Sequence, residues 1–171
     1  MFKKLIIAGM MLMITIPGFS QDSSKKTVKE KLEKEKEEQI IKEKVIANSK
    51  KLENFYKKSM ADSVAGLFSS NCHIIREYGE IIESRDLVED TFKKEFKSDK
   101  VISGCKFEPL EIKVYDEIVL EIGVNTISYS RPPDKKLYVE KYNYMFVWKE
   151  SKSGKYQIRS AMWNLPKKPG S

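Results

Sequence analysis

The sequence predicts an α+β fold, in which a curved antiparallel sheet packs on three N-terminal helices. Apolar residues recur at helical spacing over residues 40–68 and 84–96, and they alternate with polar residues from 107 to 163. Short connections join the alternating segments, as between antiparallel neighbours, and the apolar face of such a sheet needs a cover. We therefore expect the helices to cover one face of a single sheet.

The first twenty residues have the layout of a secretory signal peptide. Lys3 and Lys4 precede an apolar run from Leu5 to Ile16, and Ser20 follows a Pro–Gly break. An uncleaved anchor is the alternative, but a helix needs roughly 20 apolar residues to cross a bilayer. We expect residues 1–20 to be removed, and the mature chain to be exported from a bacterium to the periplasm or the medium.

Residues 21–39 are polar and densely charged, with Val28 and Leu32 as the only large apolar side chains. Strong helix formers and mixed charges predict a helical or disordered arm. The arm is interpreted as a spacer, and a partner-binding helix is the alternative. Residues 40–166 form the predicted domain, and 167–171 form a tail.

The domain is expected to begin with two helices. The first runs from residue 40 to about 58, and the second starts near Asp62 and ends at residues 69–71. Their inner faces carry Ile41, Val45, Leu52, Phe55 or Tyr56, then Val64, Leu67 and Phe68.

A strand over 72–77, a turn at Tyr78–Gly79 and a short returning strand over 80–83 should follow. Ser84 is a good N-cap for the third helix. The inner face of that helix carries Leu87, Val88, Phe92 and Phe96.

Four strands are expected after the helices, at 107–114, 118–124, 138–148 and 156–163. Pro109 places the first at a sheet edge, because proline cannot donate to a ladder. In the last two strands the even positions should face the helices: Tyr142, Tyr144, Phe146, Trp148, Tyr156, Ile158 and Met162. The odd positions should form a mixed surface suited to a dimer interface: Lys141, Asn143, Met145, Val147, Arg159, Ala161 and Trp163.

Composition excludes several classes of protein. The chain has 32 Lys plus Arg against 25 Asp plus Glu, one His and two Cys. One histidine cannot build a multi-histidine metal site, and two cysteines cannot build a disulfide-dense fold. The interleaved charges of the arm largely cancel in the far field, which argues against nucleic acid. No metal and no cofactor are expected.

Several short segments carry a resemblance to a known family. They are Asp62–Phe68 leading into Asn71–Ile74, Ser84–Arg85, Tyr144–Trp148 and Lys155–Ile158. In these the chain resembles the nuclear transport factor 2-like, or SnoaL-like, superfamily. The resemblance implies a cystatin-like cone, a curved sheet wrapped on a long helix, which is often dimeric and has a pocket in its mouth. Members include isomerases, dehydratases, polyketide cyclases and many non-catalytic binders.

The chain departs from the catalytic members at two places. They often carry an acidic pair where this chain has Ser70 and Asn71, and a histidine in the last strand about where Ser160 or Met162 stands. Both departures argue against catalysis.

The best ligand-binding candidates are Tyr142 and Tyr144, whose hydroxyls could supply the few polar contacts of a pocket, with Ser160 and Met162 beside them. The alternative is that the aromatic row fills the core.

His73 and Glu77 are catalytic candidates because they share one face of a predicted strand, but nothing in the sequence brings a substrate to them. A surface or structural role for His73 is favoured. Cys72 and Cys105 could pair in an exported protein, but two separate thiols are favoured because their strands should lie far apart. Cys72 and His73 are neighbours that face opposite ways, which makes a Cys–His nucleophile a weak hypothesis.

These observations favour an exported, non-catalytic module that binds a small apolar or amphipathic molecule or an envelope protein, as a homodimer. The second hypothesis is an isomerase- or lyase-type enzyme that uses the same pocket. The third is a structural envelope protein that acts through its charged arm.

Overall fold

The computed structural model describes residues 21–76 and 80–165. The chain divides into two compact units, with the boundary between Lys36 and Glu37. The predicted signal peptide at 1–20 and the predicted tail at 167–171 lie outside the described residues. No helix within the described ranges is both long and apolar enough to cross a membrane.

Helix α1, Gln21–Lys57, contributes to both units. In the first unit its surface carries ion pairs one helical turn apart, Lys29–Glu33 and Lys31–Glu35, both at 3.9 Å. In the second unit the helix buries an apolar face of Val45, Leu52 and Tyr56. The helix ends where Ser59 takes a left-handed φ of 53° and the Met60 N–H donates to the Phe55 carbonyl.

Helix α2, Ala61–Gly66, is shorter than predicted, because Phe68–Ile75 already forms strand β1. The returning strand expected at 80–83 is reduced to one bridge, in which Ile74 and Ile82 exchange backbone hydrogen bonds. The predicted turn at 78–79 lies outside the described residues.

Helix α3 spans Arg85–Phe96 and begins as the sequence predicts. The Ser84 hydroxyl accepts the Leu87 N–H at 3.3 Å, so the predicted N-cap is confirmed. Val88 and Phe92 are buried, but Leu87 is 52% exposed, and its predicted inward position is wrong.

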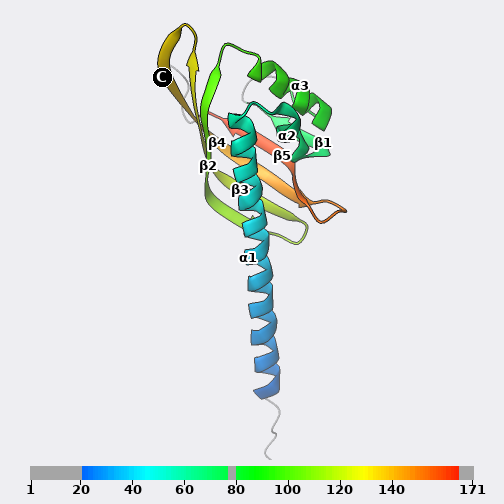
Figure 1. Ribbon diagram of the computed structural model, residues 1–171. Helices are drawn as coiled ribbons and strands as arrows, with labels where there is room; N and C mark the ends of the chain where they lie inside the picture. Colours follow the sequence, from blue (N-terminus) through cyan, green and yellow to red (C-terminus); the bar gives the residue numbers. More distant parts are fainter. Residues whose placement is uncertain (1–20, 77–79, 166–171) are drawn as a thin grey trace, which may run out of the picture. The chain divides into compact units, whose positions relative to one another are not determined.

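The sheet has five strands in the order β1-β5-β4-β3-β2. After β1 come β2 Val101–Val114, β3 Ile118–Arg131, β4 Asp134–Glu150 and β5 Tyr156–Asn164. The last four form the predicted antiparallel meander, with β2 at the predicted edge, and β1 pairs parallel to β5. Within the second unit, α1, α2 and α3 lie over one face of the sheet, called the inner face below, which confirms the predicted fold class (Figure 1).

A β-bulge in β5 changes which side chains face inward. Val147 pairs with Ser160 while the next residue, Trp148, pairs with Ile158, so Arg159 is an extra residue. The inward positions therefore shift from even to odd after Ile158. Ala161 is buried.

Strand β3 carries its polar residues inward. Glu121 and Asn125 are buried on the inner face, and Ile122 lies on the outer face. Gly123 is required between them, since a Cβ atom there would come within 2.8 Å of the Tyr144 ring and 2.9 Å of the Pro109 Cα.

Candidate functional site

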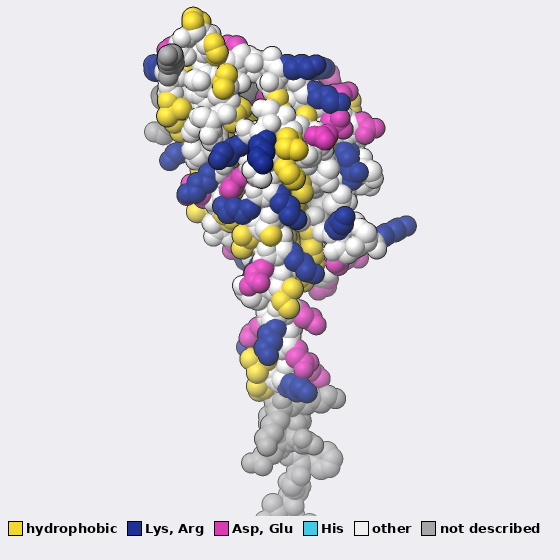
Figure 2. Space-filling view, viewed as in Figure 1, with side chains coloured by type: hydrophobic (Ala, Val, Ile, Leu, Met, Phe, Trp, Pro, Cys, Tyr) yellow, Lys and Arg dark blue, Asp and Glu magenta, His cyan; other side chains and the backbone are white. Residues whose placement is uncertain are grey.

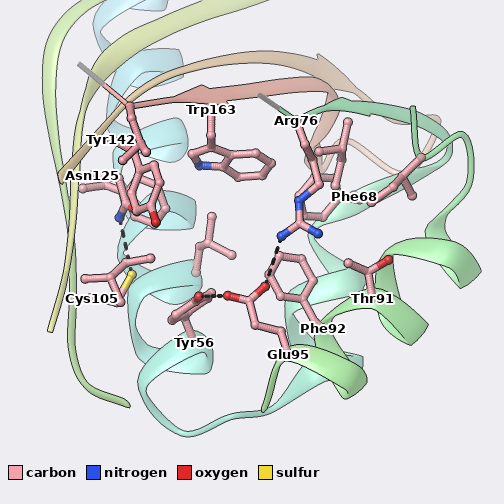
Figure 3. A pocket seen from close by; sticks show the side chains of 16 residues that line it. Tyr56, Phe68, Arg76, Thr91, Phe92, Glu95, Cys105, Asn125, Tyr142 and Trp163 are labelled. Atoms are coloured by element: carbon pink, nitrogen blue, oxygen red, sulfur yellow. Dashed lines mark hydrogen bonds and ion pairs between the residues drawn. The ribbon is translucent and has the colours of Figure 1, made fainter. Parts of the chain in front are cut away.

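A cavity of about 320 Å³ lies in the second unit, between the helices and the inner face of the sheet. Figure 3 shows the side chains that line it. Its aromatic lining consists of Tyr56, Phe68, Phe92, Phe107, Tyr142 and Trp163. Its aliphatic lining consists of Leu52, Ile74, Ile82, Ile127 and Leu165. A mostly apolar lining with a few polar groups is typical of small-molecule sites.

One wall of the cavity is organised around the carboxylate of Glu95 on α3. The Tyr56 hydroxyl donates to Glu95 Oε1, and Arg76 Nη2 lies 3.4 Å from Glu95 Oε2 (Figure 3). Burial, together with the charge and hydrogen bond of Glu95, raises the pKa of Tyr56 above its ordinary value. The phenol therefore stays protonated at neutral pH. The Tyr56 ring packs edge-on against Phe92 and Phe96, with centroid distances of 5.9 and 5.1 Å.

Tyr142 contributes a second phenol from β4. Its hydroxyl donates to Glu140 Oε2 at 2.6 Å, and burial followed by this carboxylate raises the pKa of Tyr142. Glu140 also accepts from the Tyr129 hydroxyl at 2.7 Å and lies 3.4 Å from Lys100 Nζ. Burial alone would raise the pKa of Glu140, but these donors outweigh it and lower the pKa, so the carboxylate is ionised.

Asn125 and Cys105 add polar lining beside Tyr142, and Thr91 on α3 adds a hydroxyl that donates to the Leu87 carbonyl at 2.7 Å. Asn125 Nδ2 donates to Cys105 Sγ at 3.5 Å and to the Lys106 carbonyl at 3.2 Å. Burial raises the pKa of the Cys105 thiol to about 12. The thiol is therefore protonated at neutral pH and packs as a small apolar group, since the thiolate is the nucleophilic form.

Glu121 is a fully buried carboxylate on the inner face of β3. It accepts hydrogen bonds from the Tyr144 hydroxyl and Trp148 Nε1, both at 2.7 Å, and from Ser49 Oγ at 2.9 and 3.1 Å. Burial raises its pKa, and the three donors lower it in part. The cluster ties α1 to the sheet.

Comparisons with solved structures give the fold. An NTF2-like protein with a cystatin-like fold from Novosphingobium aromaticivorans aligns with a TM-score of 0.60 at 12% identity, over 89% of this chain and 94% of that one. The chain has the nuclear transport factor 2-like fold. Neither a family model nor a curated protein matches the sequence.

Two further solved structures share this nuclear transport factor 2-like fold. A function-unknown protein from Mycobacterium tuberculosis aligns with a TM-score of 0.67 at 10% identity, over 76% of this chain and 74% of that one. A ketosteroid isomerase-like protein from Erwinia carotovora aligns with a TM-score of 0.58 at 8% identity, over 67% of this chain and 88% of that one. At these identities the likeness shows the fold alone.

The predicted ligand-binding residues of this nuclear transport factor 2-like domain separate into three groups. Tyr142 lines the cavity, whereas Tyr144 is buried and bonded to Glu121. Ser160 and Met162 face outward, opposite Val147 and Met145. The bulge at Arg159 explains why their predicted inward position is wrong.

The weak catalytic candidates are not brought to the cavity. His73 pairs with Ser160 on the outer face, where Arg159 Nη1 donates to its Nδ1 at 2.8 Å. Glu77 lies outside the described residues. Cys72 and Cys105 are both free and buried, on β1 and β2 at opposite edges of the sheet.

Sequence reasoning missed Trp163, Arg76 and Glu95 as cavity residues. Trp163 stands at an odd position of β5, which the sequence pattern assigns to the outer face, and it reaches the cavity only because of the bulge. Arg76 faces away from His73, and alternation along β1 was the one signal that could have placed it inside. No sequence pattern marks Glu95 among the many charges of α3.

Proposed function

We propose that the chain is an exported, non-catalytic binding domain whose cavity holds one small, mostly apolar molecule. The single observation that carries this proposal is the cavity itself, with an aromatic and aliphatic lining and few polar groups. Its 320 Å³ corresponds to about ten water molecules at ~30 Å³ each in the liquid. The ligand is therefore a compact ring system or a short chain.

The state of the polar groups favours binding over catalysis. The hydroxyl protons of Tyr56 and Tyr142 are donated to Glu95 and Glu140, and the Asn125 amide is bonded to Cys105 and the Lys106 carbonyl. An oxyanion that develops on a substrate needs donors aimed at it. These three groups already donate to protein acceptors.

An isomerase- or lyase-type enzyme is the competing function, and one observation favours it. Glu95 carries a carboxylate on the cavity wall, so it replaces His73 or Glu77 as the residue that would act as a base. Arg76, at 3.4 Å from Glu95, would then be the nearby cation.

The test is native mass spectrometry on the full chain, produced in bacteria with its own N-terminus and recovered from outside the cytoplasm. We expect an intact mass that lacks the first 20 residues, with a discrete small adduct on the folded chain. Ile127→Trp fills the cavity and should abolish the adduct. Thr126→Trp, at the preceding, outward position of β3, should retain it.

The outcomes separate the hypotheses. An adduct retained by Ile127→Trp would place the ligand elsewhere and overturn the proposal. A chain that stays in the cytoplasm with residues 1–20 attached would overturn export. Conversion of the released molecule by the wild-type chain but not by Glu95→Gln would establish the enzyme instead.

We also propose that the outer face of the sheet binds a second copy of the chain. Four apolar side chains lie in register across neighbouring strands there: Ile75, Met162, Met145 and Ile122. Ile75 is 45% exposed in the single chain. An apolar row on an open sheet face is the kind of surface that a homodimer covers.

A further inference from the structure

A second hollow, of about 520 Å³, lies between α1, α2 and the turn from β4 to β5. We call it the lysine groove. Its sides carry Lys44 and Lys51 from α1 and Lys155 from the turn, around the half-buried side chains of Phe55 and Tyr156. It shares no lining residue with the cavity described above.

The polar groups in the floor of the lysine groove are bonded within the protein. Asn48 Nδ2 donates to the Tyr156 carbonyl at 3.0 Å, and the Ile158 N–H donates to the Leu67 carbonyl at 2.8 Å. Gln157 Nε2 lies 3.4 Å from the Gly66 carbonyl. The floor therefore offers apolar surface. Among the ammonium groups at the sides, Lys51 Nζ donates to Asn48 Oδ1 at 3.1 Å and keeps its other N–H groups for a ligand.

The three lysines lack a carboxylate partner. Within the described residues no Asp or Glu lies within 4.0 Å of Lys44, Lys51 or Lys155, whereas Lys50 pairs with Glu53 at 3.0 Å. No acidic residue lines the groove. Figure 2 shows Lys and Arg side chains beside hydrophobic ones on the face that carries α1. The groove is thus apolar at its floor and positive at its sides.

The distance between Lys44 and Lys51 along α1 indicates how far apart the anionic groups of a ligand should lie. Lys44 and Lys51 are seven residues apart on one helix face, which at 1.5 Å per residue is about 10 Å. Two separate anionic groups match that spacing when both lysine side chains are extended. A peptide in the polyproline II conformation rises about 3.1 Å per residue with three residues per turn, so carboxylates three residues apart lie on one side of it at about 9 Å.

We propose that the lysine groove docks an acidic peptide segment of a partner protein, with two carboxylates about three residues apart and apolar side chains between them. The carboxylates pair with Lys44 and Lys51, and the apolar side chains contact Phe55 and Tyr156. Lys155 pairs with a third acidic group or with the peptide C-terminus. This site is independent of the cavity and of its ligand.

The experiment measures fluorescence anisotropy of a labelled Gly-Glu-Leu-Val-Glu-Gly peptide with the mature chain at low salt. The double variant Lys51→Gln/Lys155→Gln should weaken binding about tenfold, since each exposed ion pair contributes modestly. The control Lys94→Gln/Lys97→Gln makes the same charge change at the C-terminal end of α3, away from the groove, and should leave the affinity within about twofold.

A second variant tests the site from the other direction. Glu150 Oε1 would lie 3.8 Å from a Cβ atom at Gly154, so its charge opposes a bound carboxylate, and Glu150→Gln should tighten binding.

Equal weakening by both lysine pairs, or no difference between the acidic peptide and its Gln counterpart, overturns the proposal. Lysine-dependent binding to vesicles containing phosphatidylserine, without peptide binding, overturns it in favour of a membrane contact. Thermal melts confirm that each variant is folded.

Discussion

At the scale of single residues, Glu121 couples the stability of the domain to pH. Its pKa in the folded chain is raised by burial, so the unfolded chain releases this proton at lower pH than the folded chain does. The contribution of this group to stability is therefore full below the unfolded pKa of about 4.3 and decreases as pH rises through the folded pKa. Each hydrogen-bond donor to Glu121 lowers its raised pKa and so reduces the stability that is lost as pH rises.

Tyr144→Phe should reveal this coupling. The change removes the hydroxyl at 2.7 Å, raises the pKa of Glu121 further, and should lower the free energy of unfolding at pH 7 by about 1.5–3 kcal/mol. The loss should shrink toward pH 4, because protonation of Glu121 in the folded and the unfolded chain increases as pH falls. Urea denaturation between pH 4 and 8 measures it, and Tyr115→Phe, at an exposed tyrosine, is the control. An equal loss at every pH would contradict the role of the carboxylate.

At the scale of elements, the edge strand β2 is protected by a side chain from α1. Glu53 Oε1 accepts the Phe107 N–H at 2.7 Å, and Pro109 offers no donor two residues later. At the bulge next to Pro109, Leu110 is 77% exposed and interrupts the ladder. Unpaired strand edges invite pairing with other chains, and these three residues obstruct it.

Glu53→Ala should therefore lower stability and promote association. The free Phe107 N–H is part-buried, and leaving it unsatisfied costs about 1–3 kcal/mol. Glu53→Gln keeps an acceptor and should lose less, and Glu43→Ala, on the exposed surface of α1, should be nearly neutral. Denaturation curves together with light scattering on heating test this. If Glu53→Ala scatters no more light than Glu43→Ala, edge protection by Glu53 is wrong.

Some features of the helices and strands could be predicted from the sequence, and others could not. Helical spacing, the Ser84 cap and the short connections were sufficient for the fold class, since each depends on local chemistry. The inward faces of β3 and β5 were not predictable. Glu121 and Asn125 are polar but face inward, because residues distant in sequence hydrogen-bond with them. Ser49, Tyr144 and Trp148 donate to Glu121. Asn125 donates to the backbone of β2. A single extra residue, Arg159, moved Trp163 into the cavity.

At the scale of the whole molecule, the proposed dimer predicts a defined response to a charge on the outer face. Met145 lies on the central strand of the sheet, between Ile122 and Met162. Met145→Asp should shift the mature chain from the mass of two copies to that of one in size-exclusion chromatography with light scattering. Leu87→Asp, at an exposed position of α3, should leave the dimer intact. A single-copy mass for the wild type would refute the dimer.

The pairing of β1 with β5 has a consequence for the order of folding. The Gln157 side chain lies 3.4 Å from the Phe68 carbonyl, across 89 residues, and the cavity needs Trp163 near the end of the chain. A ribosome must therefore add β5, whose Gln157 lies 89 residues after Phe68, before β1 can join the sheet. Such long-range closure is slow. Under the proposed export, β1 therefore cannot pair with β5 until β5 has also crossed the membrane.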